Sequence, residues 1–586
     1  MPYSVEGGGE MKNALKILKY TKPHFPWLIP AVICALVSVS LTLYIPVLVG
    51  EAIDSMLGMG KVDMAQIGAV VLKIGICLGI IVVFQWLMTQ SANVVSARTA
   101  RDMRSDIFKK FNEVELSYID SHPHGDLISR IINDVDAVSD GLTQVILQFL
   151  SGIVTIIGTL VFMLSINIWI ALVVVVLTPL SVLVAAVIGR MCARSFREQQ
   201  ELQGEISSYV EEMVGNQKVV KAFAYESRSE KGFEEKNKRL FKVGLRAQFA
   251  GALANPCTRF VNNMVYAVTG IVGAVTVISS FMGALSIGQL ACFLTYANQY
   301  TKPFNEVTGV LTQIQTALAA GGRVFAVLES ESEPSDEACV EVGNVKGEVE
   351  FQNISFSYIK EKPLIRDFSL KVNSGQQIAI VGPTGCGKTT LINLLMRFYE
   401  VNGGKILIDG IDTREMKRDS LRSLFGMVLQ ESWLFEGTIM ENLRYGNPDA
   451  TDEEIINAAK LSYAHSFIRK MPKGYDTVIA ENGANLSQGQ KQLLCIARVM
   501  ALNPPMLILD EATSSIDTLT EVRVQKAFIK LMEGRTSFVV AHRLSTVRES
   551  DVILVMNEGN IVEQGTHSEL LRKKGFYEKL YNSQFN

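Results

Sequence analysis

Six long apolar segments between residues 27 and 310 constrain the fold of this chain more than any other feature of the sequence. A helix needs about 20 mostly apolar residues to cross about 30 Å of hydrocarbon. Buried helices of soluble proteins are usually shorter and more amphipathic. We therefore predict six transmembrane helices, at residues 27–50, 65–88, 142–164, 168–188, 253–279 and 287–310.

The charged residues between these segments predict how they cross the membrane. The second-to-third and fourth-to-fifth connections are rich in lysine and arginine, whereas the other three are short and contain only Lys61. Positive charge collects on the cytosolic side of membrane proteins, so both termini and the two long connections are expected in the cytosol. The polar residues 1–22 and the length of the first apolar run argue against a cleavable secretory signal.

The two long connections are polar, with few glycines or prolines to interrupt a helix. At about 1.5 Å per residue they predict helices that project tens of Å beyond the bilayer. Residues 118–125 and 212–217 are the predicted turns at the two tips. We interpret the tips as elements that couple to a soluble domain, with a plain solvated linker as the alternative.

Several polar residues interrupt the apolar segments, where their burial in lipid is costly and often marks a functional cavity. Each is a candidate for substrate contact or for bonding between neighbouring helices. They are Gln85, Gln144, Gln148, Asn262, Asn263, Asn298 and Gln299. Arg259 and Glu306 lie towards the cytosolic ends of the fifth and sixth segments and are expected either to pair or to line an inward cavity.

The composition changes at an acidic stretch that contains Pro334, after which short apolar strands alternate with amphipathic helices. This alternation is typical of an α/β domain. We expect a cytosolic segment at residues 1–26, a transmembrane domain at 27–329, a linker at 330–346 and a second domain at 347–586. The eight cysteines are scattered without a CxxC pair, which argues against a disulfide framework or a zinc site.

A phosphate-binding loop opens the second domain. The apolar strand 377–381 runs directly into Gly382-Pro-Thr-Gly-Cys-Gly-Lys-Thr389, which matches GxxxxGK[ST] between a strand and a helix beginning near Thr390. In such a loop the backbone N–H groups surround phosphates, the lysine binds the β and γ phosphates, and the final hydroxyl ligates Mg²⁺. The candidate nucleotide-binding residues are Gly382, Pro383, Thr384, Gly385, Cys386, Gly387, Lys388, Thr389 and Thr390.

A second buried strand, at residues 506–509, ends in two carboxylates. Asp510 is suited to hold Mg²⁺ directly or through water, and Glu511 to act as the base that polarises an attacking water. A strand ending in Asp-Glu is common on its own and mostly structural. Together with the phosphate loop it indicates an ATPase.

Two further side chains follow apolar strands in the same domain. Residues 537–541 deliver His542, which we interpret as a sensor of the γ-phosphate. Gln430 follows the apolar residues 427–429 and is suited to sense Mg²⁺ and water. Taken alone, such a histidine is usually a capping or core residue, and such a glutamine usually lies in a surface loop.

The second domain also contains motifs that are characteristic of one protein family. Leu486-Ser-Gln-Gly-Gln490 resembles the LSGGQ signature of ABC ATPases, and the chain is identified as a member of the bacterial multidrug and lipid exporters. The same resemblance assigns Tyr358 to adenine stacking, residues 514–517 to the D-loop and residues 541–543 to the switch histidine. It also matches residues 122–130 with Asn133 and Asp134 to the first intracellular loop. Residues 480–483 match an exporter segment that contacts the coupling helices, with Glu481 as its acid and Asn482 replacing the usual arginine.

This resemblance implies a six-helix type IV exporter domain joined to an α/β P-loop ATPase domain. It implies that two ATPase domains close head to tail, with ATP and Mg²⁺ between the phosphate loop of one subunit and the signature of the other. The signature residues of this chain are Ser487, Gln488, Gly489 and Gln490. A second half-transporter is therefore needed, in the bacterial cytoplasmic membrane. The expected substrate is an amphipathic small molecule or lipid, and no nucleic acid is expected as a partner.

Gln488 stands where the signature usually has glycine. Residues 531–535, 575–577 and 583–585 resemble the catalytically intact subunit of heterodimeric multidrug exporters. The resemblance therefore favours a heterodimer, in which this chain supplies the competent phosphate loop and its own signature faces a degenerate site.

Other functions of related proteins fit the sequence less well. A channel or regulatory relative often lacks the catalytic glutamate, whereas Glu511 is present. A soluble ABC ATPase is excluded by the six apolar segments, and importers usually encode membrane and ATPase parts separately. A peptide exporter with a fused protease is disfavoured because only residues 1–26 precede the first segment.

Overall fold

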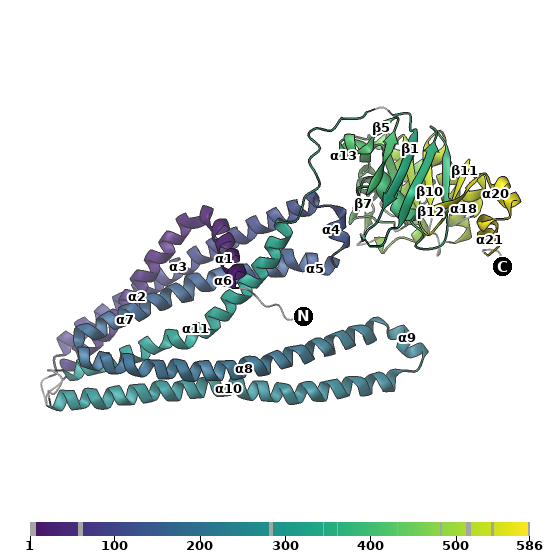
Figure 1. The fold of residues 1–586 in the computed structure, drawn as a ribbon. Helices are drawn as coiled ribbons and strands as arrows, with labels where there is room; N and C mark the ends of the chain where they lie inside the picture. The colour runs from purple at the N-terminus through teal and green to yellow at the C-terminus, as the bar shows by residue number, and fades with distance from the viewer. Residues whose placement is uncertain are drawn as a thin grey trace. The chain divides into compact units, whose positions relative to one another are not determined.

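The computed structural model describes residues 7–56, 62–279, 285–343, 345–359, 361–430, 432–480, 483–510, 517–540 and 544–583. The chain forms two compact units (Figure 1). Unit 1 comprises Met1–Glu113 and His122–Ser330, and unit 2 comprises Val114–Ser121 and Glu331–Asn586.

The described part of unit 1 is helical. Its elements are α1 (Gly7–Thr21), η1 (Lys22–His24), α2 (Phe25–Asp54), α3 (Met64–Glu113), α5 (His124–Ser129), η2 (Arg130–Asp134), α6 (Val135–Gln144), η3 (Val145–Phe149), α7 (Leu150–Ile166), α8 (Ile168–Gly215), α9 (Gln217–Ala222), α10 (Glu226–Ser279) and α11 (Ile287–Leu328). The turns η2 and η3 are π-helical. The helix α3 has 50 residues, which makes it about 75 Å long. This confirms the prediction of helices that extend well beyond a bilayer.

Each predicted membrane segment lies in one of the long helical stretches of unit 1. Among the described residues, four stretches are long and apolar enough to cross a membrane: Met11–Asp54, Met64–Glu113, His124–Ile166 and Glu226–Ser279. The fourth predicted segment corresponds to a shorter apolar stretch, Ile168–Leu180. The sixth lies in α11, which carries Asn298, Gln299 and Lys302 among its apolar residues.

Two polar contacts hold α11 in unit 1. At its start, Asp54 accepts hydrogen bonds from the Ser286 hydroxyl at 2.6 Å and from the Gly288 N–H at 2.8 Å. Near its end, Arg323 donates to the buried carboxylate of Asp134 from two nitrogens, at 2.8 and 2.5 Å. The intracellular-loop motif therefore provides an ion pair that fixes α11, because a buried carboxylate needs such a partner.

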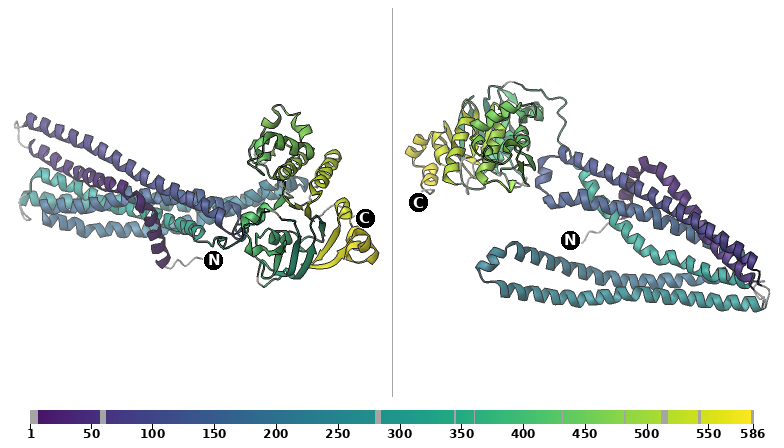
Figure 2. Two further views of the ribbon diagram at one scale, coloured as in Figure 1. Left: turned by 90° about the horizontal axis from the view of Figure 1, so that it is seen from above. Right: turned by 180° about the vertical axis from the view of Figure 1, so that it is seen from behind.

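The helices α8 and α10 lie side by side as a long hairpin with α9 at its end (Figure 2). The predicted tip at 212–217 falls on the last turn of α8 and the first residue of α9. Next to this turn, Val219 is 53% exposed and Phe223 is 79% exposed. The tip therefore carries apolar side chains that the described residues leave uncovered.

Unit 2 contains two main sheets and the helices that cover them. The six-stranded sheet has the order β12-β11-β3-β10-β9-β6, and the four-stranded sheet has the order β2-β1-β4-β5. The strands are β1 (Val349–Phe356), β2 (Ile365–Val372), β3 (Gln377–Val381), β4 (Gly403–Ile408), β5 (Ile411–Asp412), β6 (Phe425–Val428), β7 (Gly437–Thr438), β8 (Val478–Ile479), β9 (Met506–Asp510), β10 (Thr536–Val540), β11 (Val552–Asn557) and β12 (Asn560–Gly565).

The helices of unit 2 are α4 (Leu116–Asp120), α12 (Lys388–Leu395), α13 (Arg418–Ser423), α14 (Ile439–Arg444), α15 (Asp452–Leu461), α16 (His465–Ile468), α17 (Gln488–Leu502), α18 (Thr518–Met532), α19 (Leu544–Glu549), α20 (His567–Lys573) and α21 (Phe576–Ser583), with 3-10 turns η4 (Thr413–Glu415) and η5 (Gly474–Asp476). The strands β3, β6, β9, β10 and β11 run parallel. Their nearly continuous apolar residues are buried, as expected for a parallel sheet covered on both faces.

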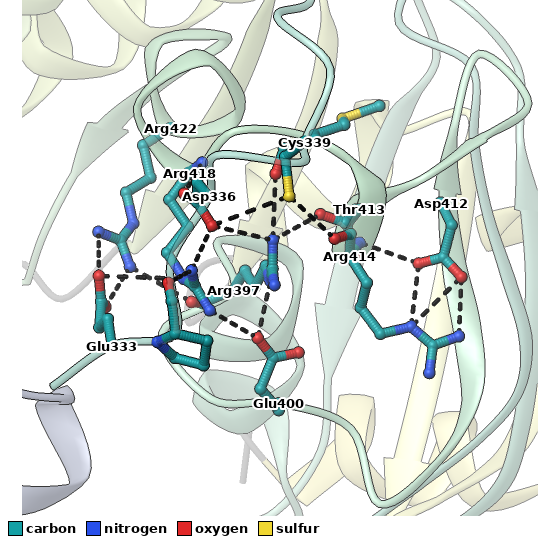
Figure 3. A network of polar contacts seen from close by, with 12 residues as sticks. Glu333, Asp336, Cys339, Arg397, Glu400, Asp412, Thr413, Arg414, Arg418 and Arg422 are labelled. Atoms are coloured by element: carbon teal, nitrogen blue, oxygen red, sulfur yellow. Dashed lines mark hydrogen bonds and ion pairs between the residues drawn. The ribbon is translucent and has the colours of Figure 1, made fainter. Parts of the chain in front are cut away.

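The acidic stretch between the two predicted domains is bound to an arginine cluster of unit 2 (Figure 3). The buried Arg418 side chain donates to Asp336 at 2.5 Å and to the Pro334 carbonyl at 2.8 Å. Arg422 donates to Glu333 at 2.7 Å. The residues predicted as a linker are therefore partly anchored rather than solvated.

Candidate nucleotide site

The phosphate loop connects β3 to α12. The helix begins at Lys388, two residues before the predicted start at Thr390. Gly387 caps the helix with a φ of +103°, and Gly385 has a φ of +81°. Side chains other than glycine are strained in this left-handed region. Loops of this kind present a concave row of backbone N–H groups that binds anions.

Lys388 and Cys386 are both buried in this loop. The Lys388 Nζ donates to the carbonyl oxygens of Gly382 at 2.8 Å and Pro383 at 3.0 Å, so its ammonium lies across the loop. The Cys386 carbonyl accepts a hydrogen bond from the Gly559 N–H at 3.1 Å. The turn between β11 and β12 is thus hydrogen-bonded to the phosphate loop.

The strand order brings the other predicted residues to the same edge of the sheet. β10 lies between β3 and β9, and β6 lies on the far side of β9. Asp510 ends β9, and Gln430 follows β6 by two residues. Because parallel strands end at a common edge, Asp510 and Gln430 share that edge with the phosphate loop. Glu511 and His542 lie outside the described residues.

The donor set of this edge fits a divalent cation with hard oxygen ligands. Thr389 is exposed in the first turn of α12, Gln430 is exposed, and Asp510 is partly buried. Mg²⁺ is usually held by one or two carboxylates together with substrate phosphates and water. The described residues contain no group of three or more His, Cys, Asp or Glu that could hold a metal. A cation here would therefore depend on hydroxyl, amide and phosphate oxygens as well.

Tyr358 lies beside the start of α12 and is 49% exposed. Its hydroxyl donates to the Thr390 hydroxyl at 3.3 Å. Its ring packs edge-on against Phe356 and Tyr399, with centroid separations of 4.9 and 5.0 Å. The aromatic ring is thus held by its neighbours while half of the side chain remains open for stacking.

Tyr399 was not predicted from the sequence, and it connects this aromatic cluster to α4. Its hydroxyl donates to the Asp120 carboxylate at 2.5 Å. Burial, followed by the hydrogen bond to Asp120, raises the pKa of Tyr399 above its usual value, so the hydroxyl stays protonated. The first predicted tip, residues 118–125, spans the end of α4 and the start of α5, and the residues on either side of Val114–Ser121 belong to unit 1.

The signature residues form the start of α17. Ser487 caps the helix, and its hydroxyl accepts from the Gln490 N–H at 3.3 Å. The Gln490 side-chain oxygen in turn accepts from the Ser487 N–H at 2.9 Å, which completes a capping box. Gln488 is exposed and Gly489 is buried. The N-terminus of this 15-residue helix has the partial positive charge that favours an anion.

The D-loop and the segment around Glu481 are only partly described. Residues 481–482 and 511–516 lie outside the described residues. Asp517 caps α18 by accepting from the Thr520 N–H at 2.9 Å. The backbone N–H of Thr520, with further help from its side chain, lowers the pKa of Asp517. The last residue of the predicted D-loop therefore has a structural role as a helix cap.

Comparison with known protein families shows which family model matches each part of the chain. Residues 28–304 match the ABC transporter transmembrane region, and residues 365–514 match the ABC transporter family. The chain is 41% identical over 492 residues to a fatty acid ABC transporter ATP-binding/permease protein of Mycobacterium bovis, covering 84% of this chain and 77% of that protein. The chain belongs to the ABC exporter family.

A second relative and a solved structure each match nearly the whole chain. An ATP-dependent lipid A-core flippase of Syntrophus aciditrophicus is 34% identical, covering 100% of this chain and 96% of that protein. The structure of a bacterial Atm1-family ABC exporter with ATP bound matches with a TM-score of 0.77 and 28% identity, covering 95% and 98% of the two chains. The exporter chain is thus a multi-pass membrane half-transporter whose ATPase domain binds ATP and couples its hydrolysis to transport. Such a half requires a dimer partner.

Proposed function

We propose that this exporter chain moves amphipathic small molecules or lipids out across the bacterial cytoplasmic membrane, as one half of a dimer that works by alternating access. The observation that carries the proposal is the sheet order β3-β10-β9-β6, which brings the phosphate loop, Asp510 and Gln430 to one edge. The names of the relatives, a fatty acid transporter and a lipid A-core flippase, support an amphipathic substrate.

The residues of this edge have distinct roles in the proposed ATP hydrolysis. Lys388 and the loop N–H groups bind the β and γ phosphates. Thr389, Asp510 and Gln430 are the residues that hold Mg²⁺, which supplies positive charge to the phosphates when bound. Tyr358 stacks on the adenine.

Two side chains outside the described residues complete the proposed chemistry. Glu511 accepts a proton from the attacking water, and His542 hydrogen-bonds the γ-phosphate. The signature residues Ser487 to Gln490 face the nucleotide of the partner subunit, where a helix N-terminus stabilises phosphate charge.

We further propose that the partner is a different half-transporter with a degenerate phosphate loop. The exposed Gln488 at the signature supports this proposal. A side chain at this position keeps the backbone farther from the γ-phosphate than glycine does. Such a signature is best tolerated opposite a site that does not hydrolyse ATP.

The test is ATP-dependent transport by inside-out vesicles that contain the exporter chain and its partner, measured with a panel of amphipathic compounds. We expect Glu511→Gln to abolish turnover and transport while ATP still binds, because the change removes the base but keeps the side-chain size. The variant should accumulate with ATP trapped in a closed dimer. Glu511 is not the base if the variant retains most of the wild-type hydrolysis rate.

A further inference from the structure

Unit 1 contains a cavity of about 510 Å³ where the end of α1 and the turn η1 meet the C-terminal part of α3. The helix α1 packs against α3 in this region (Figure 1). The volume lies within the usual range of ligand-binding pockets. The described residues that line the cavity include two lysines, two aspartates, a tyrosine and a serine. None of them belongs to the nucleotide site, so the function proposed above does not explain this cavity.

The cavity lies at the depth where lipid head groups meet the protein. Trp27 begins the first predicted membrane segment and is 43% exposed, and the Arg98 guanidinium lies 5.2 Å from its ring. Tryptophan is enriched at the membrane–water interface. Along α3, Asp102 follows Arg98 by one turn and Lys109 by three, or about 6 to 16 Å. The wall therefore lies in and just beyond the head-group layer, which is about 5–8 Å thick on each side of the hydrocarbon.

The helix α1 presents an uncovered apolar face next to this cavity. Met11, Leu15 and Leu18 recur every three or four residues and are 70, 63 and 51% exposed. Lys12 and Lys19 lie on the flank of this face, because successive residues are about 100° apart around a helix. An exposed apolar face flanked by lysines is typical of a helix that lies in the membrane interface. We therefore place Lys19 at the level of the lipid head groups.

Three charged groups of the wall are open to a ligand. The Tyr20 hydroxyl donates to one carboxylate oxygen of Asp106 at 3.0 Å, and the other oxygen has no hydrogen-bond partner among the described residues. Burial, followed by this hydrogen bond, raises the pKa of Tyr20 to about 12, so the tyrosine remains a donor. Lys19 and Lys109 are exposed, and neither forms an ion pair with a described residue.

The second acid of the wall is already engaged. Asp102 accepts two hydrogen bonds from Arg101, at 2.9 and 2.7 Å, and His24 Nε2 lies 2.9 Å from its other oxygen. The groups left for a ligand are therefore two ammonium groups and one carboxylate oxygen. A phosphate matches the lysines, and an ammonium matches Asp106. Hydrogen bonds between ionised groups are about twice as strong as neutral ones, so an ammonium binds the carboxylate better than a hydroxyl does.

We propose that this cavity binds the head group of a membrane phospholipid that carries both a phosphate and an ammonium group. Lys19 and Lys109 bind the phosphate, and Asp106, held by Tyr20, binds the ammonium. The Ser105 hydroxyl supplies a further hydrogen bond, while the acyl chains stay in the bilayer. This lipid is a resident ligand that fixes α1 at the membrane surface. The inference goes beyond the export function, because the lipid is not the transported molecule.

The test measures equilibrium binding of radiolabelled dioctanoyl phosphatidylethanolamine to the full chain in detergent micelles, with binding to protein-free micelles subtracted. Dioctanoyl phosphatidylglycerol keeps the phosphate without the ammonium, and dioctanoyl trimethylammonium propane keeps a cation without the phosphate. We expect each to compete at least about tenfold more weakly than the unlabelled ethanolamine lipid. Equal or better competition by either one overturns the proposal.

A soluble head group distinguishes a lipid from a free metabolite of the same chemistry. Phosphoethanolamine without acyl chains should compete far more weakly than the ethanolamine lipid, because it is not concentrated at the micelle surface. Equal competition by phosphoethanolamine would identify a soluble ligand and overturn the assignment to a membrane lipid.

Variants of the wall locate the binding. Asp106→Asn should weaken binding of the ethanolamine lipid at least about tenfold and leave the glycerol lipid no weaker, whereas a structural defect would weaken both. Joint Lys19→Gln and Lys109→Gln should weaken both lipids at least about tenfold. Asp140→Asn and Lys12→Gln are the matched controls, because both residues are exposed and lie outside the wall. An unchanged lipid preference in Asp106→Asn overturns the proposal.

A steric pair tests the same cavity without changing charge. Ser105 is exposed in the wall. Ser105→Ala should bind the ethanolamine lipid within about threefold of wild type, whereas Ser105→Trp should fill the space and abolish binding. Thermal unfolding shows which variants fold. If Asp106→Asn does not fold, the exposed lysine pair and Ser105→Trp decide, and lipid binding equal to wild type in either overturns the proposal.

Discussion

Lys388 and Tyr358 are proposed to bind opposite ends of ATP, so substituting each residue tests phosphate binding and adenine binding separately. We expect Lys388→Ala to weaken ATP affinity by about 10- to 100-fold, because hydrogen bonds to charged groups contribute about 1.5–3 kcal/mol. Tyr358→Ala should weaken it through the loss of a base-stacking surface, which is worth about 1–3 kcal/mol. Fluorescent nucleotide binding to the purified exporter measures both effects.

The control for this prediction is Tyr358→Phe, which keeps the ring and loses the hydroxyl with its hydrogen bonds to Thr390 at 3.3 Å and from Asn393 at 3.4 Å. Its ATP affinity should stay near that of wild type. Unchanged affinity in both Lys388→Ala and Tyr358→Ala would contradict the assignment of the site.

The phosphate loop was predictable at residue scale because its chemistry is local. Eight consecutive residues between a strand and a helix predict the loop, and the roles proposed for Lys388 and Thr389 follow from that motif. The contact of Asp120 with Tyr399 was not predictable, because the two residues are 279 positions apart. No local pattern indicates which carboxylate a tyrosine will meet.

At the scale of elements, the long helices were predictable from local sequence, whereas the contacts of the acidic stretch were not. Segment length and apolar character predicted the long helices correctly, because a membrane span needs a fixed number of residues. The anchoring of Glu333 and Asp336 by Arg422 and Arg418 was missed. An acidic stretch and a distant arginine cluster each look like ordinary solvated surface until the fold brings them together.

The contact between α4 and Tyr399 predicts how the first tip takes part in coupling. Tyr399→Phe keeps the ring against Tyr358 but removes the hydrogen bond to Asp120. We expect basal ATP hydrolysis to remain measurable, whereas substrate stimulation and transport fall severalfold. Parallel assays of hydrolysis and vesicle transport measure the ratio of the two rates.

Tyr463→Phe is a suitable control, because Tyr463 is a partly exposed tyrosine of unit 2 outside this contact. It should leave the ratio unchanged. Normal transport by Tyr399→Phe together with a charge-reversed Asp120→Lys would show that the tip has no coupling role.

The proposed heterodimer is tested with the whole molecule. We expect the chain expressed alone to give little drug-stimulated ATP hydrolysis, and co-expression with a neighbouring-gene half-transporter to give a stable one-to-one complex with full activity. Native mass spectrometry measures the stoichiometry, and ATPase assays of the same samples measure the activity. A stable homodimer with full stimulated activity would instead establish a homodimeric exporter.

The exposed tip at α9 bears on the lifetime of the chain in the cell. Phe223 is 79% exposed at the end of a hairpin that extends beyond the apolar segments. Water-exposed apolar surface of this kind marks an unassembled subunit for quality-control proteases and promotes aggregation. If the partner covers this tip in the assembled dimer, we expect a chain synthesised in excess of its partner to be degraded faster than the assembled one.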